Sequence, residues 1–92
     1  MPTKWYGIHK ATEECGELLQ CLGKLNVYPT GVHPDGENWR QKVIEEIADV
    51  RAALDYFVDH NLSTEEDAEI EKRRLQKLVK FNKWGLSGVG NG

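Results

Sequence analysis

Apolar side chains recur at spacings of three and four residues along three long segments of this sequence, and this period constrains the fold more than any other feature. The first segment, residues 4–25, contains no proline, and its periodic residues are Trp5, Ile8, Thr12, Cys15, Leu18, Leu19, Leu22 and Leu25. Such spacing places side chains along one side of an α-helix. No stretch alternates with a period of two for long enough to indicate a strand. The sequence therefore predicts an all-α fold.

Two further helices are expected. The second runs from residue 37 or 38 to about residue 60, with an apolar seam of Trp39, Val43, Ile47, Val50, Leu54 and Phe57. The third begins at Ser63-Thr64-Glu65-Glu66, which has the pattern of a capping box. Its first turns are acidic and its later turns basic, the order that the helix dipole favours. Residues 26–38, with two prolines and two glycines, are predicted to form a loop.

The size of the chain suggests one domain that associates with copies of itself. We expect residues 1–84 to form a single all-α domain and residues 85–92, which are rich in glycine, to form a flexible tail. A domain this small buries only about 60% of its unfolded surface, which makes a lone core marginal. The three helices are therefore predicted to form a bundle that is completed by oligomerisation.

Charge and hydropathy exclude several classes of protein. The formal net charge of -3 argues against general binding to nucleic-acid polymers or to anionic membranes. No segment approaches the roughly 18 apolar residues of a membrane span, and the first residues lack the apolar core of a signal peptide. We expect a cytoplasmic protein. Cys15 and Cys21 lie six residues apart on one predicted helix, too far for a disulfide, so both are predicted to be free thiols.

Two acidic clusters are the main candidates for chemistry. Glu13, Glu14 and Glu17 lie on the first predicted helix, and Glu46 and Asp49 lie on the second. Spacings of three and four place the members of each cluster on one face, at the edge of the apolar seam. If the helices pack antiparallel, the carboxylates converge and repel one another. A hard divalent cation, Mg²⁺ or Mn²⁺, would relieve this repulsion. The alternative is that both clusters are simply solvated acidic faces.

The two clusters resemble the signature of a known enzyme family. Glu13-Glu14-Cys15-Gly16-Glu17, followed by Glu46-Ile47-Ala48-Asp49, looks like the paired acidic motifs of MazG-type all-α nucleoside triphosphate pyrophosphohydrolases. The resemblance implies a homodimer or homotetramer in which Glu14, Glu17, Glu46 and Asp49 bind Mg²⁺. Glu13 would assist a second ion or the attacking water. It also implies cleavage of nucleoside triphosphates between the α and β phosphates, which gives the monophosphate and pyrophosphate.

Several other residues are candidate contacts for such a substrate. Lys77, Lys80 and Lys83, with Asn82 beside them, recur on the third predicted helix and could reach phosphates, or could form a solvated basic face. His9 precedes Glu13 by one turn and could orient that carboxylate. Four aromatic residues could stack on a nucleobase: Trp5, Tyr6, Tyr28 and Trp39. The helical spacing of Trp5 and Trp39 instead favours a place in the core.

Two functions from different classes follow from these observations. The first is a Mg²⁺-dependent pyrophosphohydrolase that shapes a nucleotide pool, with a purine deoxynucleotide such as dGTP as the expected substrate. The second is a helical interaction module without enzymatic activity, whose acidic and basic faces bind a partner protein. Stabilisation by a divalent cation is expected only of the enzyme.

Overall fold

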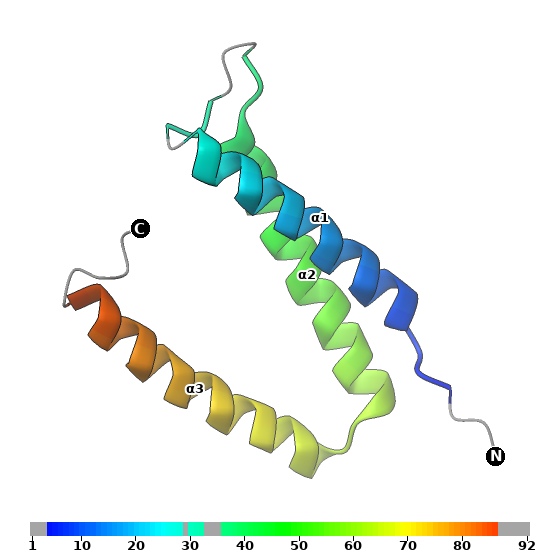
Figure 1. Ribbon diagram of the computed structural model, residues 1–92. Helices are drawn as coiled ribbons and strands as arrows, with labels where there is room; N and C mark the ends of the chain where they lie inside the picture. The colour runs from blue at the N-terminus through cyan, green and yellow to red at the C-terminus, as the bar shows by residue number, and fades with distance from the viewer. Residues whose placement is uncertain (1–3, 29, 33–35, 87–92) are drawn as a thin grey trace. The chain divides into compact units, whose positions relative to one another are not determined.

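The computed structural model describes residues 4–28, 30–32 and 36–86, and it is built from three helices (Figure 1). They are α1 (Ile8–Val27), α2 (Trp39–Asn61) and α3 (Thr64–Leu86). Within these residues there is no strand, and the one extended contact is an isolated antiparallel bridge between Val32 and Asn38. The all-α prediction is confirmed. Among the described residues, no helix combines the length and apolar character needed to cross a membrane.

Local sequence signals explain where α2 and α3 begin. The Asn38 side chain accepts a hydrogen bond from the Gln41 backbone N–H at 3.0 Å and so caps the first turn of α2, which begins at Trp39. The predicted capping box is confirmed at the start of α3. There Ser63 Oγ accepts from the Glu66 N–H at 3.1 Å, and a Glu66 carboxylate oxygen accepts from the Ser63 N–H at 2.9 Å.

Two predicted boundaries were displaced. Helix α1 begins at Ile8 instead of residue 4, because Gly7 adopts φ = 80°, which no right-handed helix accommodates. At the other end of the chain, Gly85 and Leu86, predicted as the start of the tail, continue α3. The remainder of that predicted tail, residues 87–92, lies outside the described residues.

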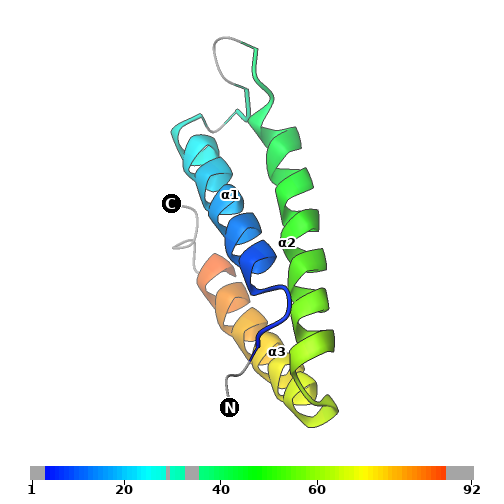
Figure 2. The ribbon, with the colours of Figure 1, turned by 90° about the vertical axis from the view of Figure 1, so that its right-hand side faces the viewer.

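The chain divides into two compact units, the first ending at Asn61 and the second beginning at Leu62. In the first unit α1 and α2 pack side by side and antiparallel (Figure 2). Their contact stripe follows a heptad-like spacing, and all its members are buried or half-buried: Ala11, Glu14, Leu18, Cys21 and Leu25 on α1, and Val43, Glu46, Val50, Ala53 and Phe57 on α2. We call these ten residues the seam.

The seam on α2 differs from the predicted one. Ile47 and Leu54 were assigned to it, but their exposed fractions are 36% and 45%. They lie on an apolar flank beside the seam. Its other large apolar residues are Leu19, Leu22 and Ile44, all exposed. Two helices cover only a narrow stripe of each other, so a wide apolar face on α2 cannot be buried by α1 alone.

The open end of the hairpin is closed by the segment before α1. Trp5 stacks on Phe57 of α2, with 5.8 Å between the ring centroids. The side chain of Asn61 accepts a hydrogen bond from the Tyr6 N–H at 2.8 Å and donates one to the Tyr6 carbonyl at 2.7 Å. These contacts hold the N-terminal turn of α1 against the last turn of α2.

Gly7→Ala is expected to lower the free energy of unfolding by about 1–3 kcal/mol. Its φ of 80° is costly for any residue with a Cβ, and a Cβ there would lie 2.7 Å from Cδ1 of Tyr56. Urea denaturation measures the effect. The matched control is Gly16→Ala, inside α1 with nothing within 4 Å of the added carbon, which should gain about 0.5–1 kcal/mol. An equal loss of stability in both variants would show that the effect does not come from the conformation of Gly7, and would contradict the prediction.

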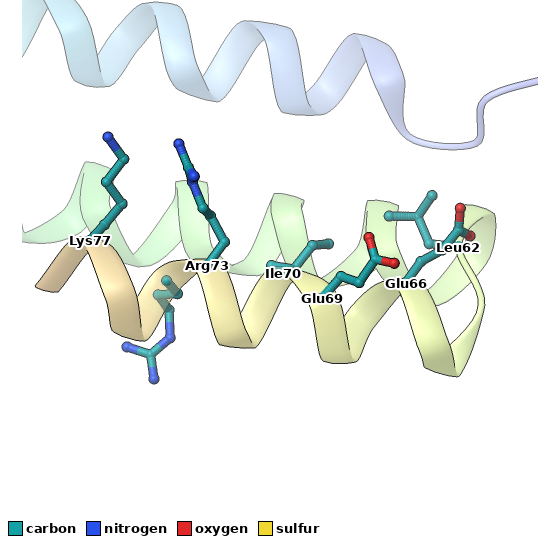
Figure 3. A pocket seen from close by; sticks show the side chains of 7 residues that line it. Leu62, Glu66, Glu69, Ile70, Arg73 and Lys77 are labelled. Atoms are coloured by element: carbon teal, nitrogen blue, oxygen red, sulfur yellow. The ribbon is translucent and has the colours of Figure 1, made fainter.

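The second unit begins at Leu62 and contains α3, and none of the described side chains on α3 is buried. A groove of about 500 Å³ follows one side of this helix, lined by Leu62, Glu66, Glu69, Ile70, Arg73, Arg74 and Lys77. Figure 3 shows Arg73 and Lys77 projecting from the same side of α3 as Ile70. By helical position, Leu75 and Val79 lie on the opposite side. Helix α3 therefore carries apolar side chains on two sides.

Candidate metal centre

The five predicted carboxylates come together in the first unit, across the packed faces of α1 and α2. One carboxylate oxygen from each of Glu13, Glu14 and Glu17 lies within 4.8 Å of the others. The same limit relates Glu14 to Glu46 and Asp49 across the helix pair. Glu14 belongs to both groups and joins them. The predicted convergence of the two acidic motifs is therefore present in the structure.

Two of these carboxylates lie in the seam itself, and not at its edge as the sequence predicted. Glu14 is only 9% exposed, and Glu46 lies opposite it on α2 in a position that the heptad spacing reserves for packing. Within the described residues, one oxygen of each, Oε2, is buried and accepts no hydrogen bond. Buried polar atoms normally have a partner, and leaving one without a partner is costly. These two oxygens are therefore in an unfavourable state that a positively charged partner would relieve.

Burial and mutual repulsion raise the pKa of both seam carboxyls above the ordinary value of 4.5. For Glu14 the largest cause is burial, followed by the negative charges of Glu17 and Asp49. For Glu46 burial is again the largest cause, followed by the charges of Glu17, Glu14 and Asp49. The Glu46 carboxyl can also share a hydrogen bond with Glu17, which favours its protonated form. The metal-free protein therefore holds these groups in an unfavourable state at neutral pH.

The residues fit a hard divalent cation. Their ligand atoms are all carboxylate oxygens, the class that Mg²⁺ and Mn²⁺ prefer. The close approach of like charges and the two unpartnered oxygens are both features that a bound cation would compensate. Mg²⁺ is usually held by one or two carboxylates together with water and substrate phosphates, so five carboxylates are enough for more than one ion.

A basic side chain also lies beside the carboxylates. Lys10 Nζ lies 3.3 Å from Glu13 Oε1, one turn earlier on α1. Both side chains are exposed, so this pair adds little stability. It does hold the Glu13 carboxylate at the solvent edge of the cluster. This ion pair could have been predicted from the sequence, because Lys10 and Glu13 are three residues apart on one helix.

The remaining predicted contacts are not part of either carboxylate group. His9 is exposed on α1, one turn before Glu13. The predicted substrate residues Lys77, Lys80, Asn82 and Lys83 all belong to α3, in the second unit. Lys77 and Lys80 line a small hollow of about 190 Å³ with two other α3 residues. The candidate centre is thus built from the first unit alone.

A hollow in the first unit was missed from the sequence. It has a volume of about 470 Å³ and is lined by Gln20, Cys21, Gly23, Lys24, Val27 and Trp39. Trp39, expected in the core, is instead half-buried, with Lys24 Nζ 5.9 Å and Lys42 Nζ 4.9 Å from its ring centroid. Lys24 and Lys42 belong to no regularly spaced series of lysines in the sequence, so the search for basic helix faces did not select them.

The chain matched none of the known protein families, curated proteins or solved structures with which it was compared. The resemblance to MazG-type enzymes therefore rests on the two acidic motifs alone. The convergence of their carboxylates is a property of this chain's own fold, and the chemistry below is argued from it.

Proposed function

We propose that this protein is a divalent-metal-dependent nucleoside triphosphate pyrophosphohydrolase. The observation that carries the proposal is the pair of seam carboxylates that lie opposite each other, Glu14, which is buried, and Glu46, which is half-buried, each with one buried oxygen that has no hydrogen-bond partner. A purely structural seam would have apolar residues at these two positions, because unpaired buried charge lowers stability. Retaining carboxylates there is reasonable where they bind a cation that the reaction requires.

The five carboxylates have two roles in the proposed reaction. Glu14, Glu17, Glu46 and Asp49 would hold Mg²⁺ or Mn²⁺. The bound ions would supply charge neutralisation for the triphosphate and lower the pKa of water. Glu13 lies at the solvent edge, paired with Lys10, where it can orient the attacking water. Water oxygen adds to the α-phosphorus, the bond from that phosphorus to the α,β-bridging oxygen breaks, and pyrophosphate leaves.

The proposed substrate is a free nucleotide, with a purine deoxynucleotide such as dGTP as the first to test. The proposed assembly is a homodimer or homotetramer. The apolar flank of the hairpin supports association, since Leu19 is 72% exposed and Ile44 is 53% exposed. Apolar side chains on two sides of α3 support it as well. Contiguous exposed apolar surface of this kind usually marks an interface.

The rival proposal is a helical interaction module without catalysis, and the same exposed apolar flank favours it. The two proposals differ in what they require of the carboxylates. A module has no use for mutually repelling acids in its seam, and it should be indifferent to divalent cations. An enzyme with this site should bind them.

We expect millimolar Mg²⁺ or Mn²⁺ to raise the melting temperature of the protein. A ligand that binds only the folded state adds about 2.7 kcal/mol when present at 100 times its dissociation constant. Differential scanning fluorimetry with and without metal measures this, with NaCl at equal ionic strength as the control. Equal melting temperatures in both salts would contradict a metal site.

The activity itself is tested by pyrophosphate release from a panel of the common ribonucleoside and deoxyribonucleoside triphosphates plus dUTP, in Mg²⁺ and in EDTA. The proposal expects release of pyrophosphate, and not of orthophosphate, that depends on the metal. Metal-induced stabilisation without turnover of any nucleotide would retain the cation site and reject the enzyme.

A further inference from the structure

The hollow that contains Trp39 lies in line with the carboxylates on the same helix pair. Lys24 follows Glu17 by seven residues on α1, and Trp39 precedes Glu46 by seven residues on α2. Seven residues are close to two helical turns, so each pair shares a helix face with an axial separation of about 10 Å. Because α1 and α2 are antiparallel, both steps lead toward the loop end of the hairpin (Figure 1). The carboxylates and the hollow are therefore neighbouring parts of one surface.

The chemistry of the hollow differs from that of the carboxylate cluster. Val27, Cys21 and the Trp39 ring give it an apolar wall, while Lys24 and Gln20 supply polar groups. Its volume of about 470 Å³ falls within the roughly 300–1,000 Å³ of small-molecule sites. Such a combination suits a flat, mostly apolar group with polar edges.

The indole N–H of Trp39 lacks a hydrogen-bond partner within the described residues. It is buried, and a buried indole N–H usually has an acceptor. Two lysine ammonium groups lie within 6.0 Å of the ring, and Lys42 also pairs with Glu37 at 3.1 Å. On a helix, side chains tilt toward the N-terminus, which directs Lys24 toward the carboxylates.

We propose that this hollow receives the base and sugar of the nucleotide, with Trp39 packed against the base and Lys24 contacting the phosphates that extend toward the metal. The inference rests on the proposed function, because the metal centre fixes the phosphate end of the substrate. A nucleoside triphosphate has its phosphates at one end and its base at the other. A molecule held at the carboxylates thus extends its base along the shared surface into the hollow. Aromatic rings accept any base by stacking.

The test uses Trp39 as its own reporter. In a Trp5→Phe/Trp84→Phe background, Trp39 is the remaining tryptophan, and its emission is followed in Mg²⁺. The ligands are the α,β-methylene analogues of dATP, dCTP, dGTP and dTTP, with inorganic tripolyphosphate as the ligand without a base. We expect a nucleotide analogue to change the emission at saturation and tripolyphosphate to leave it unchanged while competing for the site.

Substitutions then separate the base from the phosphates. Trp39→Leu should weaken nucleotide binding by about tenfold, within the range for base–aromatic stacking, and leave tripolyphosphate binding unchanged. Lys24→Met should weaken both ligands. Trp5→Leu, at the opposite end of the hairpin, is the matched control and should weaken neither. The fluorescence titration needs no change at Trp39, so it remains decisive even where Trp39→Leu disturbs folding.

The outcomes distinguish this inference from the proposed function. Nucleotide binding without any change in Trp39 emission, or Trp39→Leu weakening both ligands equally, would overturn the inference and leave the enzyme proposal standing. Failure of every nucleotide and of tripolyphosphate to bind in Mg²⁺ would overturn both. A nucleotide that binds more tightly than tripolyphosphate, by a margin that Trp39→Leu removes, would establish the base site.

Discussion

Glu46→Gln is expected to abolish pyrophosphate release and, at the same time, to raise the melting temperature of the metal-free protein. The substitution keeps the shape of the side chain but removes one negative charge from a seam position surrounded by Glu14, Glu17 and Asp49. Loss of a direct ligand should cost more activity than the roughly 10- to 100-fold that loss of a second-shell partner costs. Removal of a repelled, half-buried charge should stabilise the metal-free fold.

The neighbouring residue supplies a matched control. Glu45 is exposed on α2, accepts a hydrogen bond from Gln41 at 3.1 Å, and belongs to neither carboxylate group. Glu45→Gln makes the same chemical change one position away and should alter neither activity nor metal-free stability substantially. Steady-state kinetics measure the activity, and thermal melts in EDTA followed by circular dichroism measure the metal-free stability. If Glu46→Gln behaves like Glu45→Gln, the cluster is only a solvated acidic face.

The stability of the metal-free protein should increase as the pH is lowered from 7 toward 5. The folded-state pKa of both Glu14 and Glu46 is raised above the ordinary value of 4.5. Between pH 4.5 and these raised pKa values, the folded protein therefore binds more protons than the unfolded chain. Under that condition the free energy of unfolding falls as pH rises. The stabilising contribution of these groups is complete below pH 4.5 and is lost as pH rises through their folded pKa values.

Thermal melts in EDTA across this range measure the trend, and Glu14→Gln/Glu46→Gln should flatten it. The ion pair of Glu71 with Arg74 lowers the pKa of Glu71, so its opposite contribution is lost only below pH 4.5, outside the range tested. In saturating Mg²⁺ the trend should weaken or reverse, because protons and cations compete for the same oxygens. A metal-free melting temperature that falls steadily with acidification would contradict the raised pKa values.

The sequence predicted the helices well because their signals are local. The capping box at Ser63 and Glu66 depends on residues three apart, and the proline-rich loop breaks the period by itself. Gly7 was missed because one constraint on it is the close approach of the Tyr56 ring, which leaves no room for a Cβ and comes from a residue distant in the sequence. A local signal cannot report that contact.

The register of the seam was less predictable for a chemical reason. A search for apolar periodicity selects Ile47 and Leu54, because they are strongly hydrophobic, and passes over Glu46 and Ala53. The structure places Glu46 and Ala53 in the seam and leaves Ile47 and Leu54 on the flank. The five predicted carboxylates do converge, but the burial of Glu14 and Glu46 was underestimated, because a glutamate in a packing position is the exception to the pattern on which such predictions rest.

The predicted phosphate contacts were Lys77, Lys80 and Lys83, which recur every three residues on α3. Lys24 and Lys42 lie far apart in the sequence, and the ammonium groups of both lie close to the ring of Trp39. Their proximity to one ring follows from the antiparallel packing of α1 on α2. Such convergence can be proposed from sequence only after the helix register is known.

The placement of Glu14 and Glu46 in the seam also bears on how long each molecule survives in a cell. Their repulsion weakens the contact that holds α1 to α2, and that contact is where a bound cation would act. In a molecule without the cation, α1 would separate from α2 more often, and proteases degrade such opened chains. The abundance of the protein would then follow the supply of the proposed cation, which would limit the proposed enzyme to conditions under which it can work.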